Sequence, residues 1–66
     1  MYYEIKAGRD RDPHWSLYEV DGERRTLVER HYGDDCDANE RRYARERAWN
    51  TGRTLAAKNQ TTCKAA

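Results

Sequence analysis

The chain has 66 residues, of which 13 are Lys or Arg and 12 are Asp or Glu, so 38% is charged while the formal net charge is only +1. A chain of this length forms one small domain, residues 1–66, and is too short for a multidomain enzyme. Only six residues are Ile, Leu or Val, Phe is absent and seven are Tyr or Trp, so we expect a thin, largely aromatic core. No apolar run approaches the ~20 residues of a membrane span, so we expect no membrane segment.

The first predicted element is a strand over residues 1–7. Tyr3 and Ile5 alternate there with polar neighbours, and this period of two is typical of a half-buried strand. Residues 8–13 then break the pattern, because Gly permits positive φ and Pro withholds a hydrogen-bond donor.

Two further β-prone runs follow, over residues 15–20 and 23–32. The pair Asp21-Gly22 separates them. Because both central residues of a type I′ turn need positive φ, an Asp-Gly pair between two such runs favours a two-residue hairpin.

The hairpin register decides which side chains share a face. A two-residue loop pairs Val20 with Glu23, and a three-residue loop would instead pair Trp15 with Leu27. We prefer the first register, because it gathers more aromatic and branched residues on one side. Its core face holds Trp15, Leu17, Thr26, Val28 and Tyr32. Its other face holds Ser16, Tyr18, Val20, Arg25, Leu27, Glu29 and His31.

A helix is predicted over about residues 38–51, or as far as 60. Asp37 and Glu40 have the spacing of a capping box at its start. Gly52 either ends the helix or is tolerated inside it, and residues 61–66 are expected to be flexible. A stripe of small and apolar residues marks the buried side: Ala44, Ala48, Gly52 and Leu55. The predicted fold is therefore α+β, a three-stranded antiparallel β-meander packed against one C-terminal helix.

The two cysteines, Cys36 and Cys63, lie 27 positions apart. An unbroken helix between them separates the sulfurs by more than ~30 Å, whereas a disulfide needs Cα atoms within ~7 Å. We expect two free thiols in a reducing compartment and therefore a cytoplasmic protein.

Catalytic and metal sites receive little support. His14, Glu29 and His31 share a surface patch in the preferred register and are weak candidates for a divalent ion, because the chain lacks the short paired spacings of zinc ligands. The four glycines are scattered singly and form no phosphate-binding loop. We therefore expect no enzyme activity and no cofactor.

Charge is distributed unevenly along the chain. From Ala38 onward there are seven basic and two acidic residues. This part includes four arginines that are candidates for nucleic-acid binding, because Arg pairs with phosphate and stacks on bases: Arg41, Arg42, Arg45 and Arg53. An acidic patch that could imitate phosphates precedes them: Asp34, Asp35 and Asp37.

The second face of the predicted sheet has an apolar centre with a charged rim. A single helix covers only one side of a sheet, so Tyr18, Val20 and Leu27, with Arg25 at the edge, lack an internal partner. Tyr and Arg are enriched at protein interfaces. The leading hypothesis is a small non-enzymatic protein-binding module, an inhibitor or adaptor that binds a host protein or a second copy of itself. Nucleic-acid binding is the alternative.

One stretch loosely resembles a known family: Trp15-Ser16-Leu17-Tyr18-Glu19-Val20-Asp21-Gly22-Glu23-Arg24-Arg25. Followed by a short strand and a helix, it is similar to the sheet-plus-helix arm-binding modules of phage-type integrases over about residues 15–49. That resemblance implies DNA binding. In size and composition the chain is also similar in kind to small phage accessory proteins that block host machinery by occupying a surface, anti-CRISPR inhibitors among them.

Overall fold

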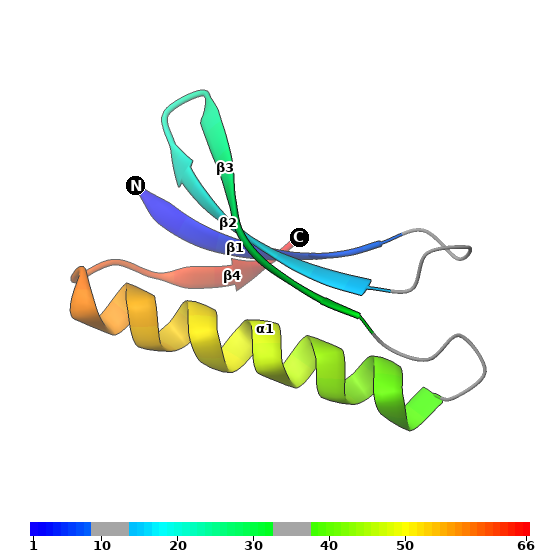
Figure 1. Ribbon diagram of the computed structural model, residues 1–66. Coiled ribbons are helices and arrows are strands. Elements are labelled where there is room, and N and C mark those ends of the chain that lie inside the picture. Colours follow the sequence, from blue (N-terminus) through cyan, green and yellow to red (C-terminus); the bar gives the residue numbers. More distant parts are fainter. Residues whose placement is uncertain (9–13, 33–37) are drawn as a thin grey trace.

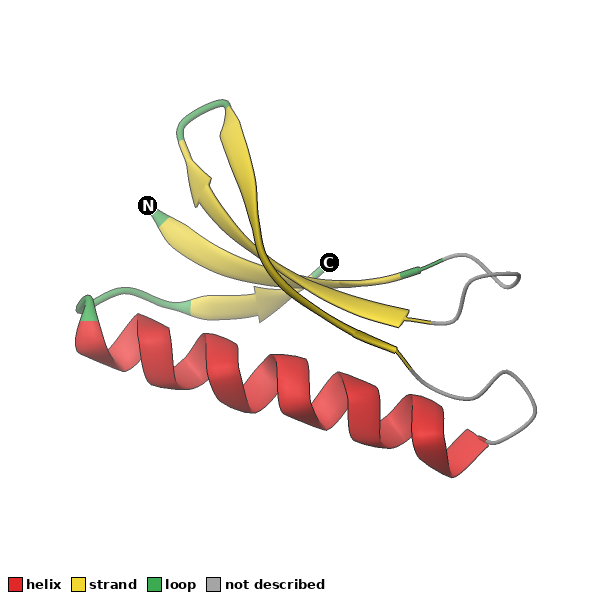
Figure 2. Ribbon diagram, in the orientation of Figure 1, coloured by secondary structure: helices red, strands yellow, loops and turns green. Residues whose placement is uncertain are grey.

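A twisted sheet packs against one long helix in the computed structural model, which describes residues 1–8, 14–32 and 38–66 (Figure 1). The predicted α+β fold is confirmed, with a fourth strand added. The elements are β1 (Tyr2–Ala7), β2 (His14–Asp21), β3 (Arg24–Tyr32), α1 (Ala38–Lys58) and β4 (Cys63–Ala65). The helix runs along one side of the sheet (Figure 2). No helix in the described ranges is both long and apolar enough to cross a membrane.

The sheet has the strand order β3-β2-β1-β4. The meander β1-β2-β3 is antiparallel, whereas β4 pairs with β1 in parallel. The backbone amide of Tyr3 donates to the carbonyl oxygen of Thr62 at 2.9 Å, and that of Ala66 donates to Ile5 at 2.9 Å. The prediction of a flexible tail over 61–66 is therefore wrong, because this segment satisfies backbone groups along the edge of β1.

The β2–β3 hairpin turns one residue later than predicted. Its central residues are Gly22 and Glu23, so Asp21 pairs with Arg24, and Val20 pairs with Arg25 instead of Glu23. Gly22 has a φ of 63°, and among the described non-glycine residues only Gln60 has a positive φ. A type II′ turn has a glycine at its first central position, and only that central residue has a positive φ. This hairpin therefore has the features of a type II′ turn. Both predicted registers are wrong.

A β-bulge then changes which residues of β3 share a face. Tyr18 pairs with Leu27, but the preceding Leu17 pairs with Glu29, so Val28 is the extra residue. Beyond the bulge, Tyr32 lies opposite His14. Val28 and Tyr32 were predicted to face the core; both are exposed.

The helix continues through Gly52 and buries residues at a spacing of four: Ala44, Ala48, Gly52 and Ala56. The predicted small-residue stripe is confirmed at its first three positions, and Leu55 lies half-buried beside it. A Cβ atom on Gly52 would lie 2.6 Å from the Cys63 Sγ and 2.9 Å from the Leu17 Cδ1. The absence of a side chain therefore allows the helix to approach the sheet closely.

The helix ends in a Schellman motif. Gln60 adopts a left-handed conformation with a φ of 54°. The amide of Thr61 donates to the carbonyl oxygen of Ala56 at 2.8 Å, and the amide of Gln60 donates to Ala57 at 3.3 Å. The chain then returns along β1 as β4.

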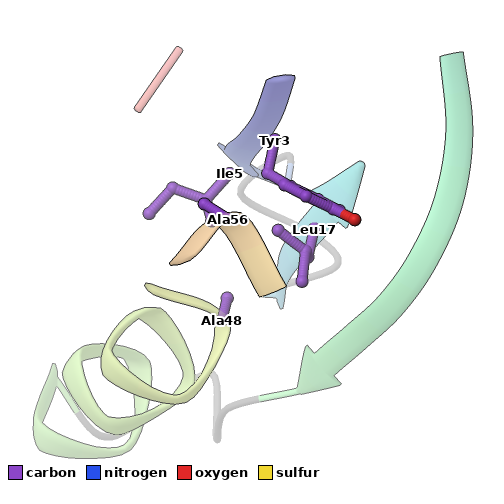
Figure 3. Close-up of a cluster of buried hydrophobic side chains, with 5 residues drawn as sticks. All are labelled: Tyr3, Ile5, Leu17, Ala48 and Ala56. Carbon is purple, nitrogen blue, oxygen red and sulfur yellow. The ribbon is translucent and has the colours of Figure 1, made fainter. Parts of the chain in front are cut away.

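The core is small and joins the helix to the two central strands. It consists of Tyr3, Ile5, Leu17, Ala48 and Ala56 (Figure 3). The hydroxyl of Tyr3 accepts a hydrogen bond from Asn59 Nδ2 at 3.0 Å, which satisfies the polar group of this buried ring. Half-buried residues surround the cluster: Trp15, Trp49, Leu55 and Cys63.

Candidate binding surface on the open sheet face

One face of the sheet carries the core residues, and side chains alternate between the two faces of each strand. The opposite side, here called the open face, has no helix or strand packed over it in the described part of the chain. Its residues follow from the strand registers: Tyr2, Glu4 and Lys6 of β1, His14, Ser16, Tyr18 and Val20 of β2, Arg25, Leu27, Arg30 and Tyr32 of β3, and Lys64 of β4.

The four residues predicted to bind a protein lie together on this face. Tyr18 pairs with Leu27 across β2 and β3, and Val20 pairs with Arg25 next to them. Leu27 is 46% exposed, whereas Val20 is only 6% exposed. The apolar centre is therefore present but smaller than the sequence predicted.

Glu4 is the one acidic residue among the open-face residues, and it is buried. The Arg25 guanidinium contacts its carboxylate at 3.0 Å. The same guanidinium lies over the Tyr18 ring, 5.5 Å from the ring centroid. Because a nearby cation compensates a buried carboxylate, Glu4 adds little negative potential to this face.

Cations make up much of the remaining open face. Arg30 Nε donates to Ser16 Oγ at 3.1 Å, and hydrogen bonds to the hydroxyls of Tyr32 and Tyr18 raise the pKa of the Arg30 guanidinium, which stays charged. Lys64 Nζ lies 4.3 Å from the Tyr2 ring centroid. With Lys6 and Arg25, the face has four cations against one carboxylate. Sequence reasoning missed three of these cations, because placing them required the register and β4.

Three tyrosines occupy the same face. Tyr32 is 60% exposed and its ring lies 5.8 Å from the His14 ring, at an interplanar angle of 57°. Tyr2 and Tyr18 are half-buried. The bulge brings Tyr32 to this face, and no sequence signal marked that bulge.

Three of the four helix arginines proposed for nucleic-acid binding meet near one end of α1. An open hollow of about 440 Å³ is lined by Trp15, Arg41, Arg42, Arg45 and Glu46. The Arg45 guanidinium lies 5.4 Å from the Trp15 ring and 6.0 Å from the Trp49 ring. It therefore covers the aromatic edge of the core. Arg53 lies elsewhere, in a hollow of about 370 Å³ beside Trp49 and Cys63.

The predicted metal cluster does not assemble. His31 Nε2 lies 2.9 Å from Glu29 Oε2, but His14 pairs with Tyr32 instead of lying opposite Glu29. This difference follows from the shifted turn and the bulge. Among the described residues no three His, Cys, Asp or Glu side chains gather into a group that could hold a metal ion.

The remaining predicted groups are Cys63 and the acidic segment. Burial raises the pKa of the Cys63 thiol, and the positive charge of Arg53 acts in the opposite direction. A thiol with a raised pKa is a poor nucleophile. Cys36 and the predicted acidic patch, Asp34, Asp35 and Asp37, lie outside the described residues, as does the predicted cap.

Comparison of the chain with protein-family models, with curated proteins and with solved structures gives no match. The function is therefore inferred from the open face itself. This face combines exposed apolar and aromatic groups with cations, which suits binding.

Proposed function

We propose that the chain is a small non-enzymatic binding protein that occupies a partner's surface with the open face of its sheet. The supporting observation is that α1 packs on one side of the sheet, while the other side presents exposed Leu27 and Tyr32 among cations. Exposed apolar groups with a charged rim are typical of interaction sites.

The charge of the open face restricts its partner. Four cations against one compensated carboxylate favour an acidic macromolecule by electrostatic complementarity. An inhibitor or adaptor of the phage accessory type, as anti-CRISPR proteins are, is a function of this kind. A cytoplasmic location agrees with the free thiol of Cys63.

Nucleic-acid binding through the helix is the second candidate. It is favoured by the convergence of Arg41, Arg42 and Arg45 on one hollow. It is weakened by the position of Arg45 over two tryptophan rings and by Glu46 in the same hollow.

The substitution Leu27→Asp tests the open face. We expect it to abolish partner binding, because it places a carboxylate in the centre of the surface while altering a side chain that is already 46% exposed. Tagged wild-type and variant chains are crosslinked in cell lysate, with and without nuclease treatment. The captured molecules are then identified by mass spectrometry and sequencing.

The matched control is Tyr43→Asp, which changes an exposed hydrophobic residue of α1 (52% exposed) to the same charge. Circular dichroism establishes that each variant is folded. Capture by the wild type and the Tyr43 variant but not by the Leu27 variant supports the proposal. Equal capture by all three chains, or no specific capture by any, contradicts it.

A further inference from the structure

Charge is segregated between the two sides of the strands. The open face has a balance of +3, from four cations and Glu4. On the other side of β2 and β3 the balance is −2, because three acidic residues, Glu19, Asp21 and Glu29, stand against Arg24 alone. A net charge of +1 for the whole chain conceals this difference.

The cations and tyrosines of the open face form a regular array. Arg30, Ser16 and Lys6 make one row across β3, β2 and β1. In the next row Tyr18 lies between Leu27 of β3 and Glu4 of β1. Lys64 of β4 follows Glu4 in the same row. Because neighbouring strands lie ~4.8 Å apart, cations flank aromatic rings over a surface four strands wide.

Resting on the proposed function, we propose that the open face binds single-stranded nucleic acid. The bases stack on Tyr32, Tyr18 and Tyr2, and the phosphates contact Lys6, Arg30 and Lys64. Proteins that bind single strands combine these two features, a cationic surface along the backbone and aromatic rings for the bases.

The cation–π contacts of Tyr2 and Tyr18 do not prevent stacking. Lys64 lies over Tyr2 and Arg25 over Tyr18, and an exposed cation–π contact is weak. A stacked base contributes more than such a contact, so a base displaces the cation favourably. The displaced ammonium of Lys64 then lies beside the strand, where it can pair with a phosphate.

A single strand fits this face better than a duplex. The bases of a duplex are already stacked on one another and do not reach an aromatic surface.

Binding is measured by fluorescence anisotropy with oligothymidine and oligouridine of ~12 nucleotides, and with a duplex of equal length. We expect the wild type to prefer the single strands. Lys6→Glu with Lys64→Glu weakens binding at least tenfold and reduces the slope of log K against log salt by ~1.4, or ~0.7 for each lost phosphate contact. Tyr32→Ala weakens binding about tenfold through lost stacking.

The controls carry equal chemical changes on the helix. Arg42→Glu with Arg53→Glu makes the same change in charge, and Tyr43→Ala removes a similarly exposed ring. We expect less than a threefold effect from each. A larger loss from the helix variants than from the open-face variants overturns the proposal, as does tighter binding of the duplex or no binding of single strands at low salt. Comparable affinity for oligothymidine and oligouridine supports base stacking as the source of the affinity. Binding of oligothymidine alone identifies DNA as the ligand, and binding of oligouridine alone identifies RNA.

Different results would contradict the proposed function and the single-strand proposal. If single strands do not bind but capture of a protein from nuclease-treated lysate still depends on Leu27, the single-strand proposal is wrong and the open face remains a binding surface. If capture is unaffected by Leu27→Asp, the proposed function itself is wrong.

Discussion

The closest approach between the helix and the sheet occurs at Gly52. A Cβ atom there would meet the Cys63 Sγ at 2.6 Å and the fully buried Leu17 at 2.9 Å. Neither neighbour can move freely, because Leu17 lies in the core and Cys63 belongs to a paired strand. The residue is therefore set by packing, although glycine is unfavourable inside a helix.

We predict that Gly52→Ala destabilises the chain by about 1–2 kcal/mol. Overpacking of a core costs ~1–3 kcal/mol, and the better helix propensity of alanine offsets up to ~1 kcal/mol of that cost. Urea denaturation followed by circular dichroism measures the change in the free energy of unfolding.

Adding Cys63→Ala to this variant removes the sulfur nearest the new methyl group. We therefore expect Gly52→Ala to lower the free energy of unfolding less in a chain that carries Cys63→Ala than in the wild type. Gly22→Ala serves as the control, because it acts through a φ of 63° with no atom within 4 Å, and Cys63→Ala leaves its effect unchanged. A Gly52→Ala chain as stable as the wild type refutes the packing argument.

The role of Gly52 could be foreseen only in part. Its place in the small-residue stripe with Ala44 and Ala48 follows from helical periodicity. Its contact with Cys63 does not, because that residue was expected in a flexible tail. A three-residue strand has too short a pattern for its pairing to be read from the sequence.

Among the elements, β4 is the one that the sequence did not predict. It lies along β1 and brings Cys63 against the helix. A hydroxyl contact also joins Thr61 Oγ1 to the carbonyl oxygen of Met1. The strand therefore ties the end of the chain to its beginning.

We predict that removing residues 61–66 lowers the free energy of unfolding by about 2–4 kcal/mol, because each net hydrogen bond contributes ~1 kcal/mol and the Cys63 contact is lost as well. The midpoint of urea denaturation measures this loss. Lys64→Ala is the control: it retains the backbone pairing, so its stability stays close to that of the wild type. If the truncated and full chains unfold at the same midpoint, β4 contributes nothing to the fold.

The strands and the helix were predictable as elements because their periodicity is local. The hairpin register was not, because Gly22 occupies the first central position of the turn instead of the second. This error left Tyr18 and Leu27 on the predicted face, since the pairing moved by an even number of positions. The bulge at Val28 changed the alternation, which is why Tyr32 was assigned to the wrong face.

For ligand binding, the distribution of charge over the molecule matters more than the net charge. A net charge of +1, taken alone, is low for a protein that binds nucleic acid, but screening confines electrostatic interactions to ~8–10 Å at physiological salt. A ligand on the open face therefore experiences mainly the local balance of +3. Composition could not reveal this balance, because it depends on which strands are neighbours.

The most direct test of single-strand binding by the open face is NMR mapping of the chain labelled with ¹⁵N, titrated separately with oligothymidine and oligouridine of ~12 nucleotides. We predict that the shifted amide resonances cluster on the strands, around Lys6, Arg30, Tyr32 and Lys64, while the resonances of residues 41–53 of the helix stay unchanged. Shifts confined to that helical segment, or no shifts at saturating concentrations of both oligonucleotides, would contradict this prediction.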